Sequence, residues 1–201
     1  MLNKSRHWLI LSLLLALSAC AVGSSARITR VNMAPGFQAA PLKRVMVVGI
    51  IEERDKRISF ENEFVRQFRA HGARAFTSLA VLPRGKENDK AEILRQARAQ
   101  KAQAIFVGFF ITMDRDSSAT PTFNEDFVSL APGINAASSV PTSYSQTKRK
   151  VRYLTQLYGV KTQKPFWTAE TQVVNPQSVG QALDLLAQQV MADLQAKGLV
   201  R

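Results

Sequence analysis

The sequence predicts an α/β fold, a two-layer or three-layer sandwich. A parallel βαβαβ start is followed by an antiparallel hairpin and a C-terminal helix. Three observations predict it. Short, continuous apolar runs alternate with amphipathic stretches in the first half of the chain. Two segments of alternating polarity come later, and a long amphipathic segment ends the chain. With 201 residues, 46% of them hydrophobic, the chain is long enough for one domain with a substantial core.

The first predicted strand and helix lie at residues 44–51 and 59–71. Residues 44–51 form a continuous apolar run, which is typical of a strand covered on both faces. In residues 59–71 the apolar side chains recur at helical spacing and form one stripe. That stripe consists of Phe60, Phe64, Val65 and Phe68. Gly72 follows where helices commonly end in the left-handed conformation, so we expect the helix to stop there.

A second strand, a second helix and a third strand follow. Residues 74–78 form the short second strand, and the second helix runs to about Gln100. Asp89 and Glu92 have the spacing of a capping pair at its start. Residues 104–113 are again continuously apolar and predict a third buried strand. The order strand, helix, strand, helix, strand implies crossover connections and a parallel sheet.

Residues 114–145 differ in composition from both flanks. They are rich in Ser, Thr, Pro, Asn and Ala and show no sustained periodicity. A patternless connection of this length is usually functional or disordered. We therefore expect a long loop that carries the specificity of the protein.

Residues 147–157 and 166–174 alternate in polarity and predict an antiparallel hairpin around a polar turn. The first of these strands is expected to have one wet face. Its inward side chains would be Val151, Tyr153, Thr155 and Leu157.

The last predicted element is the clearest helix. Ser178 and Gln181 have capping-box spacing, and a broad apolar face follows them. Gly198 is placed to end the helix. We expect this helix to lie across the sheet.

The formal net charge of +12 favours anionic partners, although excess charge can also serve solubility alone. The densest basic group lies at the start of the predicted hairpin, where Lys148, Lys150 and Arg152 share one strand face. These three are the candidate partner-binding residues, and a merely solvated strand face is the alternative. Binding to nucleic acid by stacking would need cations that alternate with aromatic side chains. This segment lacks that alternation, so we expect no nucleic-acid partner.

The residues point to no enzyme, no cofactor and no metal site. Beyond the N-terminal segment, His71 is the single histidine, and a catalytic triad needs a base oriented by a third group. Acidic and hydroxyl side chains from Asp114 to Glu125 have the spacing of a calcium loop. Ala119 replaces the glycine of its sharp turn, however, and Pro121 interrupts it. The acidic residues that follow the first strand would repel a phosphate.

The N-terminus has the layout of an export signal. Lys4 and Arg6 precede an apolar run over residues 8–17 that is too short to cross a bilayer. The run ends in Leu-Ser-Ala-Cys, and Cys20 is the only cysteine. This motif resembles the lipobox of bacterial lipoproteins, while an ordinary secretory signal is the alternative. The resemblance implies a signal peptide at 1–19 and a mature Cys20 that carries diacylglycerol and a further acyl chain such as palmitate.

The lipobox resemblance also implies a location. In lipoproteins of this kind, an aspartate directly after the cysteine retains the protein in the inner membrane, and this chain has Ala21. The implied location is therefore the outer membrane, with the protein anchored by its lipid and facing the periplasm. Residues 20–42 are small, polar and without clean periodicity, which predicts a lipidated flexible tether. Residues 43–201 would then form a single α/β domain.

Two stretches resemble small bacterial envelope lipoproteins of unassigned function. One is Lys-Arg-Val-Met-Val-Val-Gly at 43–49, followed by the predicted helix, and the other is Tyr-Gly-Val-Lys-Thr at 158–162, before a tryptophan-bearing strand. That group is similar in architecture to curli-secretion-type lipoproteins, Pel-type lipoproteins and the activators of peptidoglycan synthases. These relatives act by protein contact or ring assembly, which implies a non-catalytic role here.

The sequence therefore predicts a non-catalytic interaction or assembly module of the cell envelope. Its expected partners are the membrane, through the acyl chains on Cys20, and an envelope protein or an anionic envelope polymer. One alternative is a ring-forming accessory subunit of a secretion system, which would be a homo-oligomer. Another is a hydrolase of an envelope polymer, with its paired carboxylates among Asp114, Asp116, Glu125 and Asp126.

Overall fold

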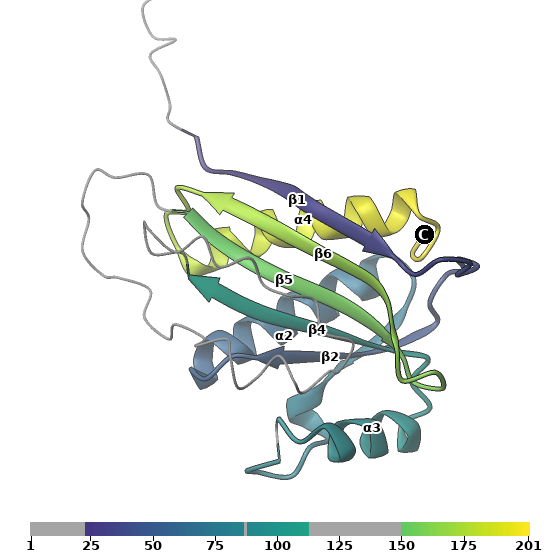
Figure 1. The fold of residues 1–201 in the computed structure, drawn as a ribbon. Helices are drawn as coiled ribbons and strands as arrows, with labels where there is room; N and C mark the ends of the chain where they lie inside the picture. The colour runs from purple at the N-terminus through teal and green to yellow at the C-terminus, as the bar shows by residue number, and fades with distance from the viewer. Residues whose placement is uncertain (1–22, 87, 113–149) are drawn as a thin grey trace, which may run out of the picture.

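The computed structural model describes residues 23–86, 88–112 and 150–201. These residues form one six-stranded mixed sheet in the order β1-β6-β5-β4-β2-β3, with helices on both faces (Figure 1). The strands are β1 (Ser25–Met33), β2 (Arg44–Ile50), β3 (Arg74–Thr77), β4 (Ala104–Thr112), β5 (Lys150–Gly159) and β6 (Pro165–Val174). The helices are α2 (Arg54–Ala70), the short 3-10 helix η1 (Ser78–Ala80), α3 (Lys90–Ala99) and α4 (Val179–Ala196).

The α/β prediction is confirmed in its three-layer form. Helices α2 and α4 lie side by side on one face of the sheet, and their apolar side chains join a large core with β1, β2 and β4–β6. Helix α3 packs on the opposite face, where Ile93, Leu94 and Ala97 meet a second core built on β2, β4 and β5. None of the helices in the described ranges is long and apolar enough to cross a membrane.

The predicted parallel unit and hairpin are both present. Strand β2 pairs in parallel with β3 and β4, and β5 pairs antiparallel with β4 and β6. The predicted caps also form: the side chain of Asp89 accepts a hydrogen bond from Glu92 N, and that of Ser178 accepts one from Gln181 N, each at 3.1 Å. The expected loop at 114–145 lies outside the described residues.

The predicted tether at 20–42 was wrong for much of its length. Residues Ser25–Met33 form β1, which pairs antiparallel with β6 at the edge of the sheet. The register shifts between Ile28 and Arg30, so an extra residue interrupts the alternation of inward and outward side chains. This bulge is the physical reason why the segment shows no clean period. The sheet therefore begins only a few residues after Cys20, which itself lies outside the described residues.

Helix α2 begins at Arg54, five positions before the predicted start at residue 59. The apolar stripe could not indicate this first turn, because its buried side chain is Arg57. Arg57 is 5% exposed and donates from Nε to Oε1 of Glu61 at 2.9 Å. The prediction relied on apolar spacing and so missed a turn that is held by a buried ion pair.

Glu61 is fully buried and connects three elements through hydrogen bonds. Its carboxylate accepts from Gly49 N on β2 at 3.0 Å, from Ser78 Oγ at 2.6 Å and from Leu79 N at 3.1 Å, in addition to Arg57. Because these four hydrogen bonds engage both oxygens of the carboxylate, its desolvation cost is offset. Glu61 thus fixes α2 against the carboxyl ends of β2 and β3.

Two glycines make room for Phe60 on the same face of the sheet. Gly49 and Gly108 are direct neighbours on β2 and β4, and the Phe60 ring lies against them. A Cβ at residue 108 would lie 1.9 Å from Phe60 Cζ, a separation that no folded protein tolerates. The glycines let α2 approach the sheet closely enough for Phe60, Phe64 and Phe106 to form contacting ring pairs.

Replacing Glu61 with Gln is expected to lower the free energy of unfolding by about 3 kcal/mol, because the guanidinium of Arg57 loses its buried counter-charge. Urea denaturation measures this change. Glu63→Gln is the matched control on the same helix: it removes a carboxylate that pairs with the exposed Arg66 and should cost no more than about 1 kcal/mol. Equal effects of the two substitutions would contradict the role given to Glu61.

Replacing Gly108 with Ala is expected to destabilise the protein by about 1–3 kcal/mol, since the new methyl group and the Phe60 ring cannot occupy the same space. Gly180→Ala is the control, because the nearest atom to its added Cβ is Ser178 Oγ at 3.8 Å. In the first turn of α4 an alanine should be neutral or stabilising by up to about 1 kcal/mol. Thermal unfolding of both variants tests the pair, and an unperturbed Gly108→Ala variant would refute the close approach.

Candidate functional site

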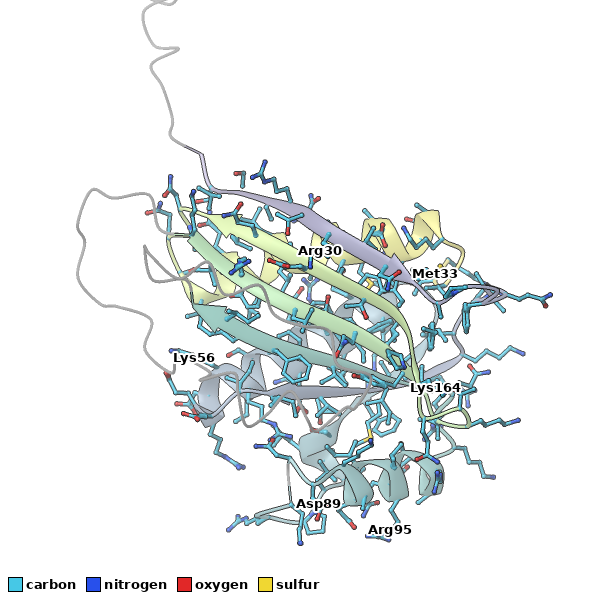
Figure 2. All side chains as sticks on the ribbon, in the orientation of Figure 1. Arg30, Met33, Lys56, Asp89, Arg95 and Lys164 are labelled. Atoms are coloured by element: carbon cyan, nitrogen blue, oxygen red, sulfur yellow. The ribbon has the colours of Figure 1, made fainter. Side chains whose placement is uncertain are left out.

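One end of the sheet, which we call the basic end, gathers cations from segments far apart in the sequence. The parallel strands β2, β3 and β4 begin there, β1 and β5 finish there, and the three α-helices end there (Figure 1). Figure 2 shows Lys164 and Met33 at this end, while Lys56 lies at the opposite one. Two grooves open at the basic end, and they share Leu42 as a wall.

The first groove, the basic groove, has a volume of about 610 Å³. Four of its lining residues are cationic: Lys43, Arg44, Arg74 and Arg201. Its described lining includes neither Asp nor Glu. The guanidinium of Arg44 lies 5.4 Å from the centroid of the Phe76 ring, and its Nε is buried without a hydrogen-bond partner. This concentration of one sign of charge in a concave surface attracts anions.

The second groove, the apolar groove, has a volume of about 740 Å³. Phe37 stacks on Phe166 at one wall, with ring centroids 4.3 Å apart and planes inclined by 6°. Phe37 remains 36% exposed, which is unusual for so large an apolar ring. Three exposed lysines also line this groove: Lys101, Lys161 and Lys164. The groove therefore combines apolar walls with positive charge, and its described lining again includes no acidic residue.

Residues 34–42, which connect β1 to β2, form walls of both grooves. They are held to the domain at both ends: Ala34 N donates to Phe166 O, and Leu42 N donates to Leu199 O, each at 2.9 Å. This segment belongs to the predicted tether, so that prediction also missed the segment's part in the grooves.

Lys101 occupies a backbone position that normally favours glycine. Helices α2, α3 and α4 end with the same pair of backbone hydrogen bonds, and the residue after the C-cap is left-handed in all three. In α2 and α4 that residue is glycine, as predicted, with Gly72 at φ 84° and Gly198 at φ 68°. In α3 it is Lys101, at φ 55°. A lysine there carries a conformational cost that a glycine would avoid, and its side chain lines the apolar groove.

The helix dipoles do not cancel the positive charge of the basic end. The carboxyl ends of α2, α3 and α4 each carry about half a negative charge, which amounts to roughly −1.5 in total. The basic groove contributes four cations and the apolar groove three lysines. Some of this positive charge stabilises the helix ends. The excess positive charge leaves a surface suited to an anionic ligand or partner.

The predicted basic strand is placed differently from what its sequence suggests. Lys150 is exposed at the start of β5, but Arg152 lies on the sheet and donates from Nη1 to Oε1 of Glu170 at 2.6 Å. Lys148 lies outside the described residues. The wet face expected for β5 was wrong, since Leu154 and Gln156 are at most 1% exposed. Gln156 bonds to Thr168 and accepts from the hydroxyl of Tyr158, which satisfies its polar atoms within the sheet.

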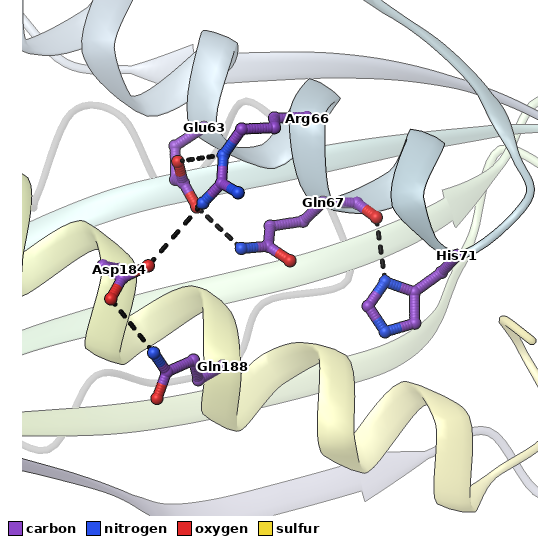
Figure 3. Close-up of polar contacts among 6 residues, drawn as sticks. All are labelled: Glu63, Arg66, Gln67, His71, Asp184 and Gln188. Carbon is purple, nitrogen blue, oxygen red and sulfur yellow. Dashed lines mark hydrogen bonds and ion pairs between the residues drawn. The ribbon is translucent and has the colours of Figure 1, made fainter.

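The remaining polar cluster lies between α2 and α4 and has a structural role (Figure 3). Arg66 pairs with Glu63 at 2.6 Å and approaches Asp184 on α4 at 3.6 Å. Partial burial by itself would raise the pKa of Glu63, but hydrogen bonds from Arg66 and Gln67 outweigh it and lower that pKa. His71 Nδ1 lies 2.9 Å from the carbonyl of Gln67, so that nitrogen carries the proton. The imidazole caps its own helix.

The described residues hold no group of three or more His, Cys, Asp or Glu side chains that could bind a metal. The acids considered for calcium or for hydrolysis lie outside the described ranges, as does Cys20. These acids are Asp114, Asp116, Glu125 and Asp126. Burial raises the pKa of the Tyr153 phenol, so this hydroxyl stays protonated. The chemistry that the described surface offers is charge attraction and apolar contact at the basic end.

Sequence reasoning missed the basic end because its cations are not neighbours in the chain. They come from the start of β2, the start of β3, the turn after α3, the β5–β6 turn and Arg201. The available signal was positional: most of these cations lie near a predicted strand start or helix stop, and Lys161 lies in the predicted turn of the hairpin.

Comparisons with known proteins support the fold. No protein-family model matches the chain, and no curated protein matches it. Among solved structures, the chain is similar to a subunit of the PelC dodecamer from Paraburkholderia phytofirmans, with a TM-score of 0.51 and 16% identity, covering 89% of this chain and 100% of that one. It also matches the lipoprotein GNA1162 from Neisseria meningitidis at a TM-score of 0.43 and 11% identity, over 77% and 99% of the two chains. The domain thus shares its fold with PelC, in agreement with the resemblance to Pel-type lipoproteins.

Replacing Lys101 with Gly is expected to stabilise the protein by about 1 kcal/mol, because glycine adopts the left-handed conformation without steric cost. Chemical denaturation measures the gain. Lys161→Gly, in the turn between β5 and β6, is the control, since Lys161 has no positive φ and its replacement should give no such gain. A destabilised Lys101→Gly variant would show that the lysine side chain holds the fold.

Proposed function

We propose that this protein is a non-catalytic binding module of the cell envelope, tethered to the outer membrane through an acylated Cys20 and facing the periplasm. The basic end is the observation that carries the proposal. Two grooves there present seven cationic side chains, and their described lining includes no acidic side chain. Such a surface suits an anionic partner, either an acidic envelope protein or an anionic envelope polymer.

The position of β1 supports a defined geometry for the anchored protein. Residues 21–24 alone separate Cys20 from Ser25, the first residue of β1, and so few residues span at most about 18 Å. The nine residues of β1 then extend roughly 30 Å toward the basic end. The acylated end of the domain would therefore sit close to the bilayer, with the grooves at the far end of β1. This separation favours a periplasmic partner over the anchoring membrane.

Crosslinking in living cells tests the proposal. A photoreactive amino acid in place of Arg74 should capture a partner, and a second charge-reversing substitution, Lys43→Glu, should abolish that capture. Arg54→Glu is the matched control, since Arg54 is exposed at the opposite end of the sheet. Lys150→Glu tests the sequence-predicted basic strand in the same assay.

Two results would contradict the assignment. If Lys43→Glu leaves the crosslink intact while Lys150→Glu removes it, the start of β5 is the contact and the basic end is not. If Arg54→Glu removes it as completely as Lys43→Glu, the crosslink reports net charge rather than a specific surface.

A ring-forming subunit is the second candidate, favoured by two observations. The structure with a similar fold is a dodecamer. Three acids, Glu52, Glu53 and Asp55, also lie where β2 gives way to α2, at the end opposite the grooves, interleaved with Arg54 and Lys56. Contacts between unlike ends of successive copies are heterologous, and they close into a ring when the rotation allows it.

Light scattering on the full chain carrying Cys20→Ser tests ring formation without the acyl chains. We expect a mass several times that of one chain at low salt, falling as salt screens the contacts between these acids of one copy and the groove cations of the next. A strict monomer at high protein concentration and low salt would exclude this form of assembly.

A further inference from the structure

We propose that the apolar groove is a binding site for a single-chain anionic lipid, a monoacyl amphiphile with a phosphate headgroup. The inference deepens the proposed function, because it names the chemistry of one ligand at the basic end. It rests on the proposed function only for the cellular location of the protein, because the residues that line the groove do not depend on an anchor at Cys20.

The walls of the groove suit an acyl chain. Phe37 and Phe166 present a flat stacked pair, and Leu42 and Ala102 add aliphatic surface. At about 740 Å³, the groove lies within the usual size of small-molecule sites. Phe166 is only 6% exposed and supports the partly exposed Phe37 from beneath, so the aromatic wall is formed before any ligand arrives. A preformed wall lowers the ordering cost of binding.

The lysines of the groove suit the headgroup. Lys101 comes from the turn after α3, and Lys161 and Lys164 come from the turn between β5 and β6, so the ammonium groups derive from two separate elements. A lysine ammonium is a point charge that commonly binds phosphate. A phosphate monoester carries up to two negative charges near neutral pH, and more than one lysine can engage it.

The backbone at Lys101 is an independent observation in favour of a ligand. Two helices of this domain end on glycine at the equivalent position, while α3 ends on a lysine in the left-handed conformation. Backbone strain of this kind often accompanies functional positions. Here the strained residue is also the one that brings an ammonium group to the groove from α3.

A bilayer surface and an acidic peptide fit less well. A bilayer would have to reach a groove that lies beyond the far end of β1. An acidic peptide would bring several carboxylates but no long chain to fill the apolar part. A single-chain lipid supplies one apolar tail and one anionic head, the two features that the groove combines.

Titration calorimetry on the full chain carrying Cys20→Ser tests the site, with the probes held below their critical micelle concentrations. We expect 1-oleoyl lysophosphatidic acid to bind with one-to-one stoichiometry. Lysophosphatidylcholine, which has no net charge, should bind at least about tenfold more weakly, and inorganic phosphate and a glutamate-rich peptide should not bind measurably. Oleate separates a carboxylate head from a phosphate head and should bind more weakly than the phosphate lipid.

Variants separate binding from folding. Lys101→Gly, the variant expected to be more stable, should bind the lipid about fivefold to tenfold more weakly. Loss of structure cannot explain weaker binding by a more stable variant. Lys161→Glu with Lys164→Glu should abolish binding, and Phe37→Ser should weaken it without changing the preference for the anionic head. Arg54→Glu, far from the groove, is the control for net charge.

Several outcomes would overturn the inference. These are equal affinity for the charged and the zwitterionic lipid, unchanged affinity in Lys101→Gly, or binding of the glutamate-rich peptide in preference to the lipid. Absence of lipid binding with the Arg74 crosslink intact would reject this inference and leave the proposed function standing. Lipid binding without an Arg74 crosslink would support this inference and reject the proposed function.

Discussion

The buried carboxylate of Glu61 is the interaction on which the rest of the structure depends. It accepts hydrogen bonds from the backbone of β2, from the segment after β3 and from Arg57 on its own helix. These contacts fix the start of α2 over the carboxyl ends of the parallel strands. Phe60, the preceding residue, then lies against Gly49 and Gly108. With α2 fixed, α4 packs beside it and the two helices cover one face of the sheet.

The polarity of the domain follows from this arrangement. One end of the sheet holds the buried Glu61 network and the start of α2, where acidic and basic side chains are mixed. The other end collects the starts of β2, β3 and β4 and the ends of three helices. Cations stabilise helix carboxyl ends, so their presence there has an ordinary cause. The cations outnumber the partial negative charges of the helix ends. The excess positive charge lines two concave grooves. A surface of this kind suits binding, which is why we place the function there.

The edge strand β1 limits how far the domain of an anchored protein can lie from its membrane. A flexible tether of about 20 residues would let the domain move far from its membrane. Incorporation of Ser25–Met33 into the sheet leaves only a short connection to Cys20. The domain would thus be held near the bilayer by one end of the sheet, with the grooves at the other end. Residues 34–42 then serve as groove walls, a role that needs them fixed by hydrogen bonds to Phe166 and Leu199.

The sequence by itself determined the α/β class, the parallel unit, the hairpin and the helix caps at Asp89 and Ser178, because these depend on local periodicity and on side chains three residues apart. The tertiary structure alone decided the rest. Strand β1 was hidden by a bulge that breaks alternation, and the first turn of α2 by an ion pair that apolar spacing does not reveal. The basic residues predicted from one dense run proved to include Arg152, which is paired with Glu170 on the sheet. The grooves were invisible in the sequence because their cations lie on five separate segments, and only the folding of the chain brings those segments to one end.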